Sequence, residues 1–513
     1  MTGTMEQPRP AAPEDAAADA AKRARASRQW RSLWRIHFYS GLFSMPFLLL
    51  MALTGLVILY TQPIRDATQS ELWTVEAKTL PYVSLDRQEA AVQRAYPDDT
   101  VSDVTPPASR DRSTRFFVDD GSKDGIYVFV NPYTGAVLGD TGTAGGIVGL
   151  SNRLHGFLNN DTIKVSLPTV SAIWDDGAVM RPYEVGDLLL EILGVWTLVL
   201  VASGVYLFWP RHSRYSEGTK GRRRLLTWRK GAHGRARWRD LHGLGGLVMA
   251  AVLVLTIVSG MGWSTYWGPS FNALAAEITP GNVVDQPSSE LGVRGDLDRL
   301  GNQIPWATGD FPIPASYAPE KENGEVPAPM RLDRVATIAV REGMRPGYTI
   351  TFPSNEEDEA GNTVYGSFAL SNSWPRKTSE ARDLFLDQFT GRTLAEQSVY
   401  GNGSIATGMD TLVSVHMGTQ LGLVDRIVMT LLCVLTIWAI VSGFVMFWKR
   451  RRKGTAGFPR RPADPRLTTK LVVVAVVLGI IYPEWGISAL IVLGLDRFVI
   501  RKVPRLRAAF GQP

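Results

Sequence analysis

Cysteine is almost absent from this chain of 513 residues, and histidine occurs only six times. The single cysteine, Cys433, excludes an internal disulfide, and no Cys-x-x-Cys-His motif is present for covalent haem attachment. No glycine-rich dinucleotide fingerprint follows a predicted strand, so the chain has no evident NAD or flavin domain. The polar segments hold no nucleophile beside an obvious base and no clustered ligands with metal-binding spacing. These absences leave hydrolytic chemistry without support.

Long hydrophobic runs are the main positive feature of the sequence. The mean hydropathy of −0.02 averages strongly apolar runs with polar blocks. Four runs, at about 37–61, 187–209, 242–266 and 422–448, are each long enough to cross about 30 Å of hydrocarbon. The first run is not a cleavable signal peptide, because it is too long, lacks a small-residue cleavage site and follows a largely polar tail.

Basic residues predict the orientation of these spans. Lysine and arginine concentrate in 22–35, in 211–240 and directly after the fourth run, whereas the two large segments between spans lean acidic. Because basic loops stay in the cytoplasm, we expect a cytoplasmic N-terminus and two outer segments. The net charge of +6 then reflects topology and contact with the lipid bilayer, and we expect no nucleic-acid partner.

The chain contains the same membrane unit twice, and histidines recur at matching places. His37 opens the first apolar run and His242 opens the third, while His155 precedes the second run and His416 the fourth. Hydroxyl–glycine steps recur in the same way, at Thr54-Gly55, Ser259-Gly260, Ser203-Gly204 and Ser442-Gly443. Four of six histidines at equivalent positions of a duplicated unit indicate a shared role.

Imidazole on a helix is well suited to hold a haem iron. Two axial imidazoles must lie at one depth of the membrane, which allows only the pairs His37/His242 and His155/His416. We therefore predict two haems b, an inner and an outer one, with these four histidines as the metal ligands. His155 is the least secure ligand because 48 residues separate it from Ser203, against 26 from His416 to Ser442. The alternative is that all four are structural, interfacial histidines.

Glycines and arginines complete the predicted cofactor sites. Gly55 and Gly260 fall at the depth of the outer haem, and Gly204 and Gly443 at that of the inner one. A glycine lets a flat macrocycle approach the helix backbone, although small residues also serve ordinary helix packing in membranes. Anionic propionates need cationic partners, for which the basic residues near the histidines are candidates: Arg31, Arg35, Arg237 and Arg239 for the inner haem, and Arg153 for the outer one.

The outer segments combine short helices with strands. Helical spacing predicts helices over 85–92 and 332–339, strands are expected at 115–118, 126–130, 136–138 and 348–352, and a strand with its turn is expected over 383–391. Together with the turn Asn-Pro-Tyr-Thr-Gly (131–135) and the paired Ser-Gly-x-x-x-Phe-Trp endings, these features resemble the PepSY-associated transmembrane proteins of bacterial plasma membranes. The resemblance covers residues 30 to about 505. It implies small α+β PepSY domains outside the bacterial inner membrane, and that some relatives are iron-regulated, haem-containing reductases of ferric siderophores.

The expected architecture is a polytopic α-helical membrane protein with a duplicated two-helix unit, four spans, a C-terminal hairpin or fifth span, and two extracytoplasmic α+β PepSY-like domains. Its parts in order are a disordered cytoplasmic tail (1–27), span 1 (28–61), outer domain 1 (62–186), span 2 (187–210), a basic cytoplasmic loop (211–240), span 3 (241–267), outer domain 2 (268–415), span 4 (416–449), a basic linker (450–469), an apolar C-terminal segment (470–500) and a tail (501–513). The hairpin is the preferred form of that segment, because one span would place its arginines outside.

The function that follows is transmembrane electron transfer. Electrons would enter at His37/His242, cross to His155/His416 and reduce an outer acceptor, which we expect to be ferric siderophore iron or a siderophore-binding protein. The donor would be a quinol or a separate cytoplasmic reductase, and no residue is assigned a catalytic role. The rival hypothesis is a non-enzymatic membrane protein whose PepSY domains bind a peptide, protease or uptake partner. Transport of a metal or siderophore is disfavoured, since the spans hold few ionisable residues.

Overall fold

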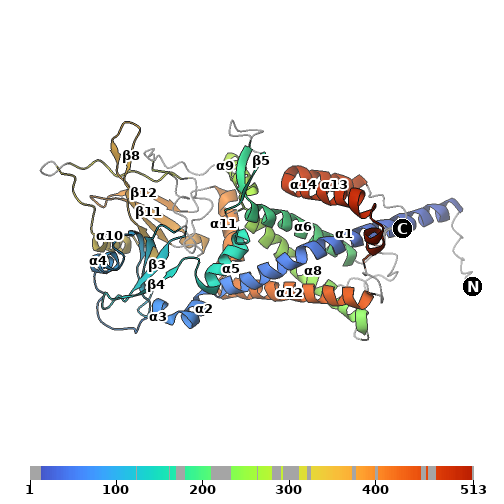
Figure 1. Cartoon of the computed structure of the whole chain (residues 1–513), viewed down its shortest axis with the longest axis horizontal. Coiled ribbons are helices and arrows are strands. Elements are labelled where there is room, and N and C mark those ends of the chain that lie inside the picture. Colours follow the sequence, from blue (N-terminus) through green and yellow to red (C-terminus); the bar gives the residue numbers. More distant parts are fainter. Residues whose placement is uncertain are drawn as a thin grey trace, which may run out of the picture. The chain divides into compact units, whose positions relative to one another are not determined.

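The structure of the protein is a computed structural model (Figure 1). It describes residues 13–122, 124–160, 162–168, 180–208, 231, 233–262, 264–279, 291–292, 311–320, 325–372, 377–398, 403–451, 458–459 and 469–510, with side chains from residue 27 on. The chain forms two compact units. Unit 1 contains Met1–Leu49, Glu191–Val254 and Val434–Pro513, and unit 2 contains Leu50–Leu190 and Leu255–Cys433. Each unit is described by itself.

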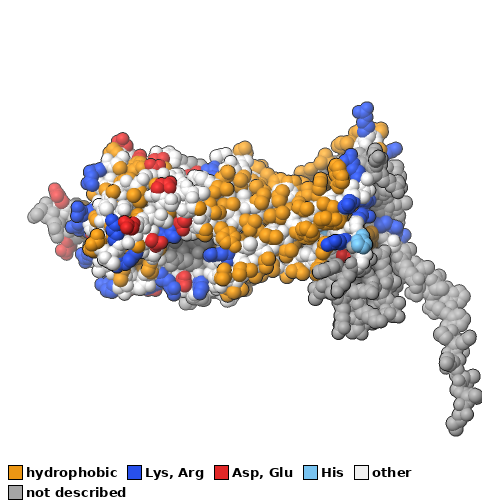
Figure 2. All heavy atoms as spheres, turned by 90° about the horizontal axis from the view of Figure 1, so that it is seen from below, with side chains coloured by type: hydrophobic (Ala, Val, Ile, Leu, Met, Phe, Trp, Pro, Cys, Tyr) orange, Lys and Arg blue, Asp and Glu red, His pale blue; other side chains and the backbone are white. Residues whose placement is uncertain are grey.

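Four long apolar helices make the chain a multi-pass membrane protein. They are α1 (Pro13–Leu59), α6 (Val185–Phe208), α8 (Gly234–Met261) and α12 (Leu423–Arg450). At most 28% of the most apolar window of each helix is buried, so most of its side chains face outward. Figure 2 shows hydrophobic side chains gathered over the helical part of the chain on the face that it presents. An apolar surface of this extent requires lipid around it, and all four helices fall on the four apolar runs of the sequence.

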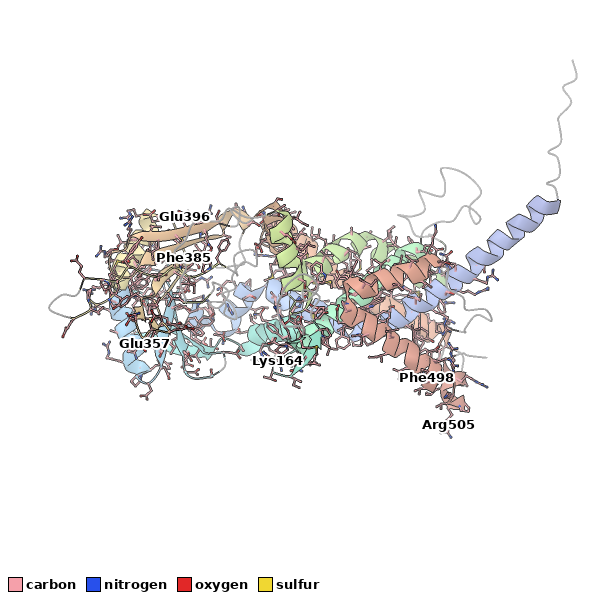
Figure 3. All side chains as sticks on the ribbon, turned by 90° about the horizontal axis from the view of Figure 1, so that it is seen from above. Lys164, Glu357, Phe385, Glu396, Phe498 and Arg505 are labelled. Carbon is pink, nitrogen blue, oxygen red and sulfur yellow. The ribbon has the colours of Figure 1, made fainter. Side chains whose placement is uncertain are left out.

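Unit 2 is built on an eight-stranded antiparallel sheet of order β12-β11-β10-β7-β1-β2-β3-β4. The strands are β1 (Thr100–Thr105), β2 (Thr114–Asp119), β3 (Ile126–Val130), β4 (Val137–Gly142), β7 (Tyr348–Thr351), β10 (Ser367–Asn372), β11 (Arg382–Asp387) and β12 (Thr393–Ser398). The paired strands β11 and β12 can be found in Figure 3 by the labels of Phe385 and Glu396. A short separate pair, β8 (Glu356–Glu357) and β9 (Thr363–Val364), lies outside this sheet.

The sheet joins the two outer segments of the chain into one body. The central strands β1 and β7 pair antiparallel, with Val104 opposite Ile350 and Asp103 opposite Thr351. The sequence predicts one PepSY-like domain in each segment, and the structure has strands from both segments in a single sheet.

One helix from each segment supplies the core above the sheet. These helices are α4 (Leu85–Ala95) and α10 (Leu332–Arg341), which confirm the helices predicted at 85–92 and 332–339. Val92 and Val335 are fully buried in one apolar cluster with Phe116 and Ile350 of the sheet. Burying each such side chain contributes about 1.5–3 kcal/mol. The spacing of apolar residues on these helices therefore determines which face packs on the strands.

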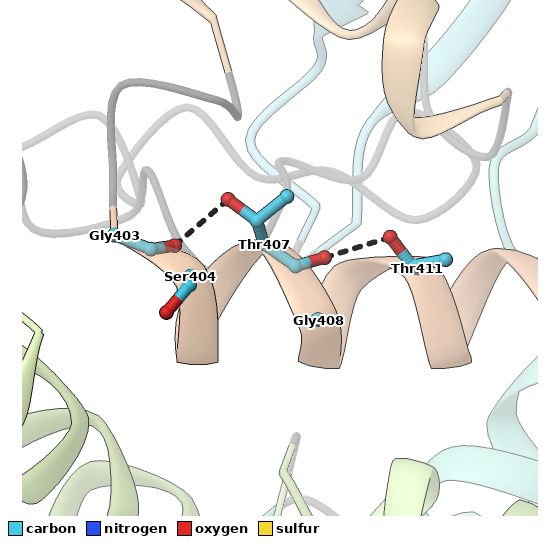
Figure 4. A pocket seen from close by; sticks show the side chains of 5 residues that line it. All are labelled: Gly403, Ser404, Thr407, Gly408 and Thr411. Carbon is cyan, nitrogen blue, oxygen red and sulfur yellow. Dashed lines mark hydrogen bonds between the residues drawn. The ribbon is translucent and has the colours of Figure 1, made fainter.

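The remaining elements of unit 2 include the helices that carry its histidines. They are α2 (Thr61–Thr68), α3 (Ser70–Trp73), α5 (Gly146–Phe157), the strand pair β5 (Lys164–Pro168) and β6 (Met180–Glu184), α9 (Trp267–Ile278), the short helix η4 (Thr378–Glu380) and α11 (Ser404–His416). A hollow beside the first turns of α11 is lined by Gly403, Ser404, Thr407, Gly408 and Thr411 (Figure 4). Thr407 and Thr411 each donate a 2.8 Å hydrogen bond to a backbone carbonyl of the same helix, and no charged side chain lines the hollow.

Unit 1 contains a helical hairpin after the last long helix. Helix α13 (Thr469–Ile481) turns at Tyr482 into α14 (Pro483–Leu495), which continues as a π-helix, η6 (Asp496–Ile500), and ends before α15 (Pro504–Ala509). Phe498 and Arg505 mark these last elements in Figure 3. Gly479 and Gly486 let the two helices approach, since a Cβ on Gly486 would stand 3.1 Å from the Gly479 Cα. The apolar segment 470–500 is therefore two helices packed together.

Candidate functional site: two histidine pairs

The first histidine pair lies in unit 1, where α1 and α8 meet. His37 of α1 and His242 of α8 have ring centroids 6.4 Å apart, and their planes are inclined by 80°. Both rings are surrounded by apolar helix surfaces, and both lie where the sequence predicts the inner pair.

The second pair lies in unit 2, on two short helices. His155 is near the end of α5, and His416 is the last residue of α11. Their ring centroids are 6.2 Å apart, with planes inclined by 74°. Burial, together with the neighbouring His416, lowers the pKa of His155 to about 4, and burial lowers the pKa of His416 to about 4 despite a hydrogen bond to the Thr256 backbone. Both imidazoles are neutral at physiological pH, which is the form that binds metals.

Each imidazole is held at Nδ1 by the hydroxyl of a hydroxyl–glycine step on another helix. The distances are 3.2 Å from His37 to Ser203, 2.9 Å from His242 to Ser442, 2.9 Å from His155 to Thr54 and 3.0 Å from His416 to Ser259. The Nδ1 atoms of the unit 1 pair also lie near backbone carbonyls, at 3.0 Å from Leu200 for His37 and 3.1 Å from Ala439 for His242.

These hydroxyls select the tautomer of the histidines. Each hydroxyl donates its own proton to a backbone carbonyl one turn earlier in its helix, at Leu50, Leu200, Thr256 and Ala439. A hydroxyl has one proton to donate, so its oxygen must accept from the imidazole. The proton of each ring is therefore on Nδ1, and the lone pair is on Nε2. Metal-binding histidines are commonly oriented in this way, with one nitrogen donating and the other ligating.

The distance between the rings of each pair fits one metal ion between them. Two imidazoles that each bind a metal through a nitrogen at about 2 Å place their centroids about 6 Å apart. The observed 6.4 Å and 6.2 Å agree with this geometry. No group of three or more His, Cys, Asp or Glu that could hold a metal occurs among the residues that the structure describes.

The four glycines lie directly against the imidazole rings. A Cβ on Gly204 would stand 2.9 Å from the His37 Cε1, and one on Gly443 would stand 3.6 Å from that of His242. The corresponding distances are 3.4 Å from Gly55 to His155 and 3.8 Å from Gly260 to His416. Each glycine thus falls at the pair that the sequence assigns to it. The contacts present are with the imidazoles, so the glycines make room for the rings themselves.

Arg35, Arg239 and Arg153, which the sequence predicts as partners of haem propionates, interact with other groups of the protein instead. Arg35 donates to the carbonyl of Pro459 and lies 5.3 Å from the Tyr39 ring centroid. It is two residues from His37, which puts it on the opposite side of α1. Arg239 is largely exposed and pairs with Asp240 at 3.3 Å. Arg153 pairs with Asp124 at 2.6 Å and also donates to Asn159.

Arg450 is a candidate binding residue that the sequence analysis did not single out. Its guanidinium lies 4.3 Å from the Trp34 ring centroid, and its Nη1 is shielded from solvent with no hydrogen-bond partner in the described part of the chain. It follows Gly443 by seven residues, or two helical turns, on the same face of α12. Arg211 follows Gly204 by the same seven residues, so the repeat itself contains the signal. A guanidinium whose shielded Nη1 has no acceptor among the described residues is suited to an anionic group such as a carboxylate.

Of the two remaining histidines, His233 is exposed directly before α8, and His212 lies outside the described residues. Cys433 is buried beside the unit 2 pair, where its Sγ would be 3.7 Å from a Cβ on Gly55.

Four apolar helices and two histidine pairs from a repeated unit define a multi-pass membrane protein with an internal duplication. The family model of the PepSY-associated TM region matches residues 34–450, and the chain belongs to this family. No curated protein matches the chain. The family match ends with α12, so the helical hairpin of α13 and α14 follows the matched region.

Proposed function

We propose that the protein carries electrons across the membrane through two b-type haems. The observation that carries this proposal is the pair geometry: four imidazoles form two pairs with ring centroids 6.4 and 6.2 Å apart, and the hydroxyl at each Nδ1 favours the tautomer with its lone pair on Nε2. Haem supplies reversible one-electron chemistry at its iron when it is bound. The protein supplies ligands, orientation and an apolar surrounding.

Each group of residues has a distinct role in this proposal. His37 and His242 would hold the inner haem, and His155 and His416 the outer one. The Ser and Thr hydroxyls hold the rings in the ligating tautomer, and the glycines provide space beside them. Arg450 is placed to bind a haem propionate of the inner site because its Nη1 is shielded and lacks an acceptor.

The distribution of charge supports an orientation and a location. The basic residues of 22–35, 211–240 and 449–453 favour a cytoplasmic N-terminus and basic loops, with the sheet of unit 2 outside a bacterial plasma membrane. Electrons would then pass outward from His37/His242 to His155/His416.

An external ferric siderophore is the acceptor that we propose. The outer segments lean acidic, which favours a neutral or cationic ferric complex over an anionic one such as ferric citrate. The donor inside the cell would be a membrane quinol or a separate cytoplasmic reductase.

Haem content tests the proposal directly. Purified protein should show a Soret band and two haems b per chain by pyridine haemochrome assay. His37→Ala or His242→Ala should each remove one haem and leave the other, and His416→Ala should remove the second haem instead. His233→Ala, at an exposed histidine outside both pairs, is the matched control and should retain both haems.

Two outcomes would contradict the proposal. Colourless wild-type protein would leave the histidines structural and favour a PepSY membrane protein that binds a peptide, protease or uptake partner. Unchanged haem content in a histidine variant would exclude that residue as a ligand.

A further inference from the structure

Two buried carboxyl groups lie in unit 1, one on α6 and one on the C-terminal hairpin that packs against α6 through Trp196, Trp485 and Ser488. Glu191 of α6 is 1% exposed, and Glu484 in the first turn of α14 is 3% exposed. Carboxyl groups buried in an apolar membrane helix are rare and generally mark a functional site. Ionising Glu191 and Glu484 together would be unfavourable.

Polar atoms at this contact have no partner among the described residues. Both side-chain oxygens of Glu484 lack a hydrogen bond, and so does the indole Nε1 of Trp485, which is 4% exposed. Leaving such groups unsatisfied is unfavourable. A hydrogen-bond acceptor and a donor, adjacent in sequence and both shielded from solvent, are arranged to bind a ligand that offers a hydroxyl and an oxygen.

The surroundings of these atoms are aromatic, and the hairpin that carries them exposes apolar side chains. The Trp196 and Trp485 rings lie 5.4 Å apart at 57°, and the Trp196 indole donates to Ser488 at 3.1 Å, which fixes α6 against α14. On the outside of the hairpin Ile480 and Leu490 are each 69% exposed. A ligand that reaches the two carboxyls would therefore come from the lipid phase, with an apolar tail and a small aromatic headgroup.

We propose that this contact between α6 and α14 is a quinol-oxidation site. One quinol hydroxyl donates to Glu484, and the Trp485 indole donates to a quinol oxygen. The inference rests on the proposed function, because oxidation needs the ferric iron of the inner haem as electron acceptor. Loss of two electrons and two protons converts the quinol to the quinone. The electrons would pass singly to that iron, and the protons would pass one at a time to the single carboxylate that the Glu484/Glu191 pair carries, which releases each proton to water before it accepts the next.

Helix α6 connects this site to the inner histidine pair. The carbonyl of Leu200, which lies 3.0 Å from the His37 Nδ1, is nine residues after Glu191. Nine residues correspond to about 14 Å of helix. The proposed quinol site and the hydrogen-bond partners of His37, Leu200 and Ser203, thus lie on one helix within unit 1.

Reduction kinetics test the role of the carboxyls. Decylubiquinol is mixed with purified, haem-loaded protein, and haem reduction is followed by visible absorbance. Glu484→Gln keeps the size of the side chain but cannot accept the proton, so the rate should fall at least about 100-fold, as for loss of a general base. Glu191→Gln should slow the reaction in the same direction, and Asp496→Asn, at the far end of α14, should not. Dithionite should reduce all variants fully, which separates a failed site from lost haem.

A second measurement does not depend on haem. An azido-ubiquinone should photolabel peptides of α6 and α14 in wild-type protein, and Trp485→Phe should reduce that labelling several-fold. Labelling elsewhere, or a wild-type rate of reduction in Glu484→Gln, would overturn the quinol site even if both haems are present. Protein without haem that still labels at α14 would overturn the proposed function and quinol oxidation with it, and would leave α14 as a quinone-binding site only.

Discussion

At the scale of single residues, the four hydroxyls have a chemical role beyond packing. Each hydroxyl uses its proton within its own helix and accepts from a histidine of another element, so the ligating nitrogen is fixed before any metal binds. The four histidines are not held equally. His242 has a second Nδ1 neighbour in the Ala439 carbonyl at 3.1 Å, whereas the hydrogen bond recorded for His155 is to Thr54.

This asymmetry predicts unequal effects of removing a hydroxyl. Thr54→Val should weaken haem binding at the outer pair about 10–100-fold, the usual effect of losing a partner of a ligand. Ser442→Ala should weaken the inner site less, because the carbonyl still holds the ring of His242. Titration of haem-free protein with haemin, followed by Soret absorbance, measures both. Equal losses in the two variants would mean that the hydroxyls do not orient the rings.

At the scale of helices, the glycine positions set how closely a helix approaches a histidine. The clearance differs between copies: a Cβ would stand 2.9 Å from the ring at Gly204 but 3.8 Å at Gly260. The first distance requires the ring to move, and the second is ordinary van der Waals contact. Alanine substitutions at Gly204 and Gly260 therefore form a matched pair of tests.

Gly204→Ala should displace His37 and lower the occupancy of the inner haem severalfold. Gly260→Ala should leave the outer haem in place, and the better helix propensity of alanine, about 1 kcal/mol over glycine, favours its helix. Haem content and the Soret spectrum of the two purified variants decide the matter. A full inner haem in Gly204→Ala would show that this close approach has no bearing on ligation.

At the scale of the whole chain, local patterns predicted the elements but not all of their pairings. Hydropathy and spacing predicted the four long helices, α4, α10 and most strands, because each depends on a short window of sequence. The pairing of β1 with β7 joins Val104 to Ile350, and no local pattern specifies a register over such a separation. The histidine pairs were predictable because the duplication carries them. The sequence analysis did not single out Arg450, because it is one of several basic residues directly after a span and these are explained by membrane orientation alone.

The junction between the two halves of unit 2 depends on reciprocal helix capping. The Asp86 carboxylate accepts from the Leu332 and Asp333 N–H groups at 2.9 and 3.4 Å, and Asp333 accepts from the Leu85 N–H at 2.8 Å. Asp86 thereby supplies α10 with the cap that Arg331 lacks. The carboxylate of each helix satisfies the first N–H of the other.

The two carboxyls titrate in opposite directions. Burial raises the pKa of Asp333, as does its hydrogen bond to Asp86. Burial also acts to raise the pKa of Asp86, but hydrogen bonds from the Asp333 side chain and from the Leu332 and Asp333 backbone lower it overall. The contribution of Asp86 to stability is therefore present above about pH 3.9, its unfolded pKa, and is lost as pH falls through its lower folded value. That of Asp333 is complete below about pH 3.9 and is lost as pH rises through its raised folded value.

Substitution by asparagine should separate these contributions at neutral pH. Asp86→Asn removes an ionised cap and should destabilise the junction by about 1 kcal/mol. Asp333→Asn resembles the protonated form that the fold favours, so it should leave stability unchanged or raise it slightly. Hydrogen exchange of the β1 and β7 amides in the full-length protein measures the junction itself, and exchange in β12, at the sheet edge, is the internal control. Faster exchange at β1 and β7 in Asp333→Asn than in Asp86→Asn would reverse the assigned roles of the two carboxyls.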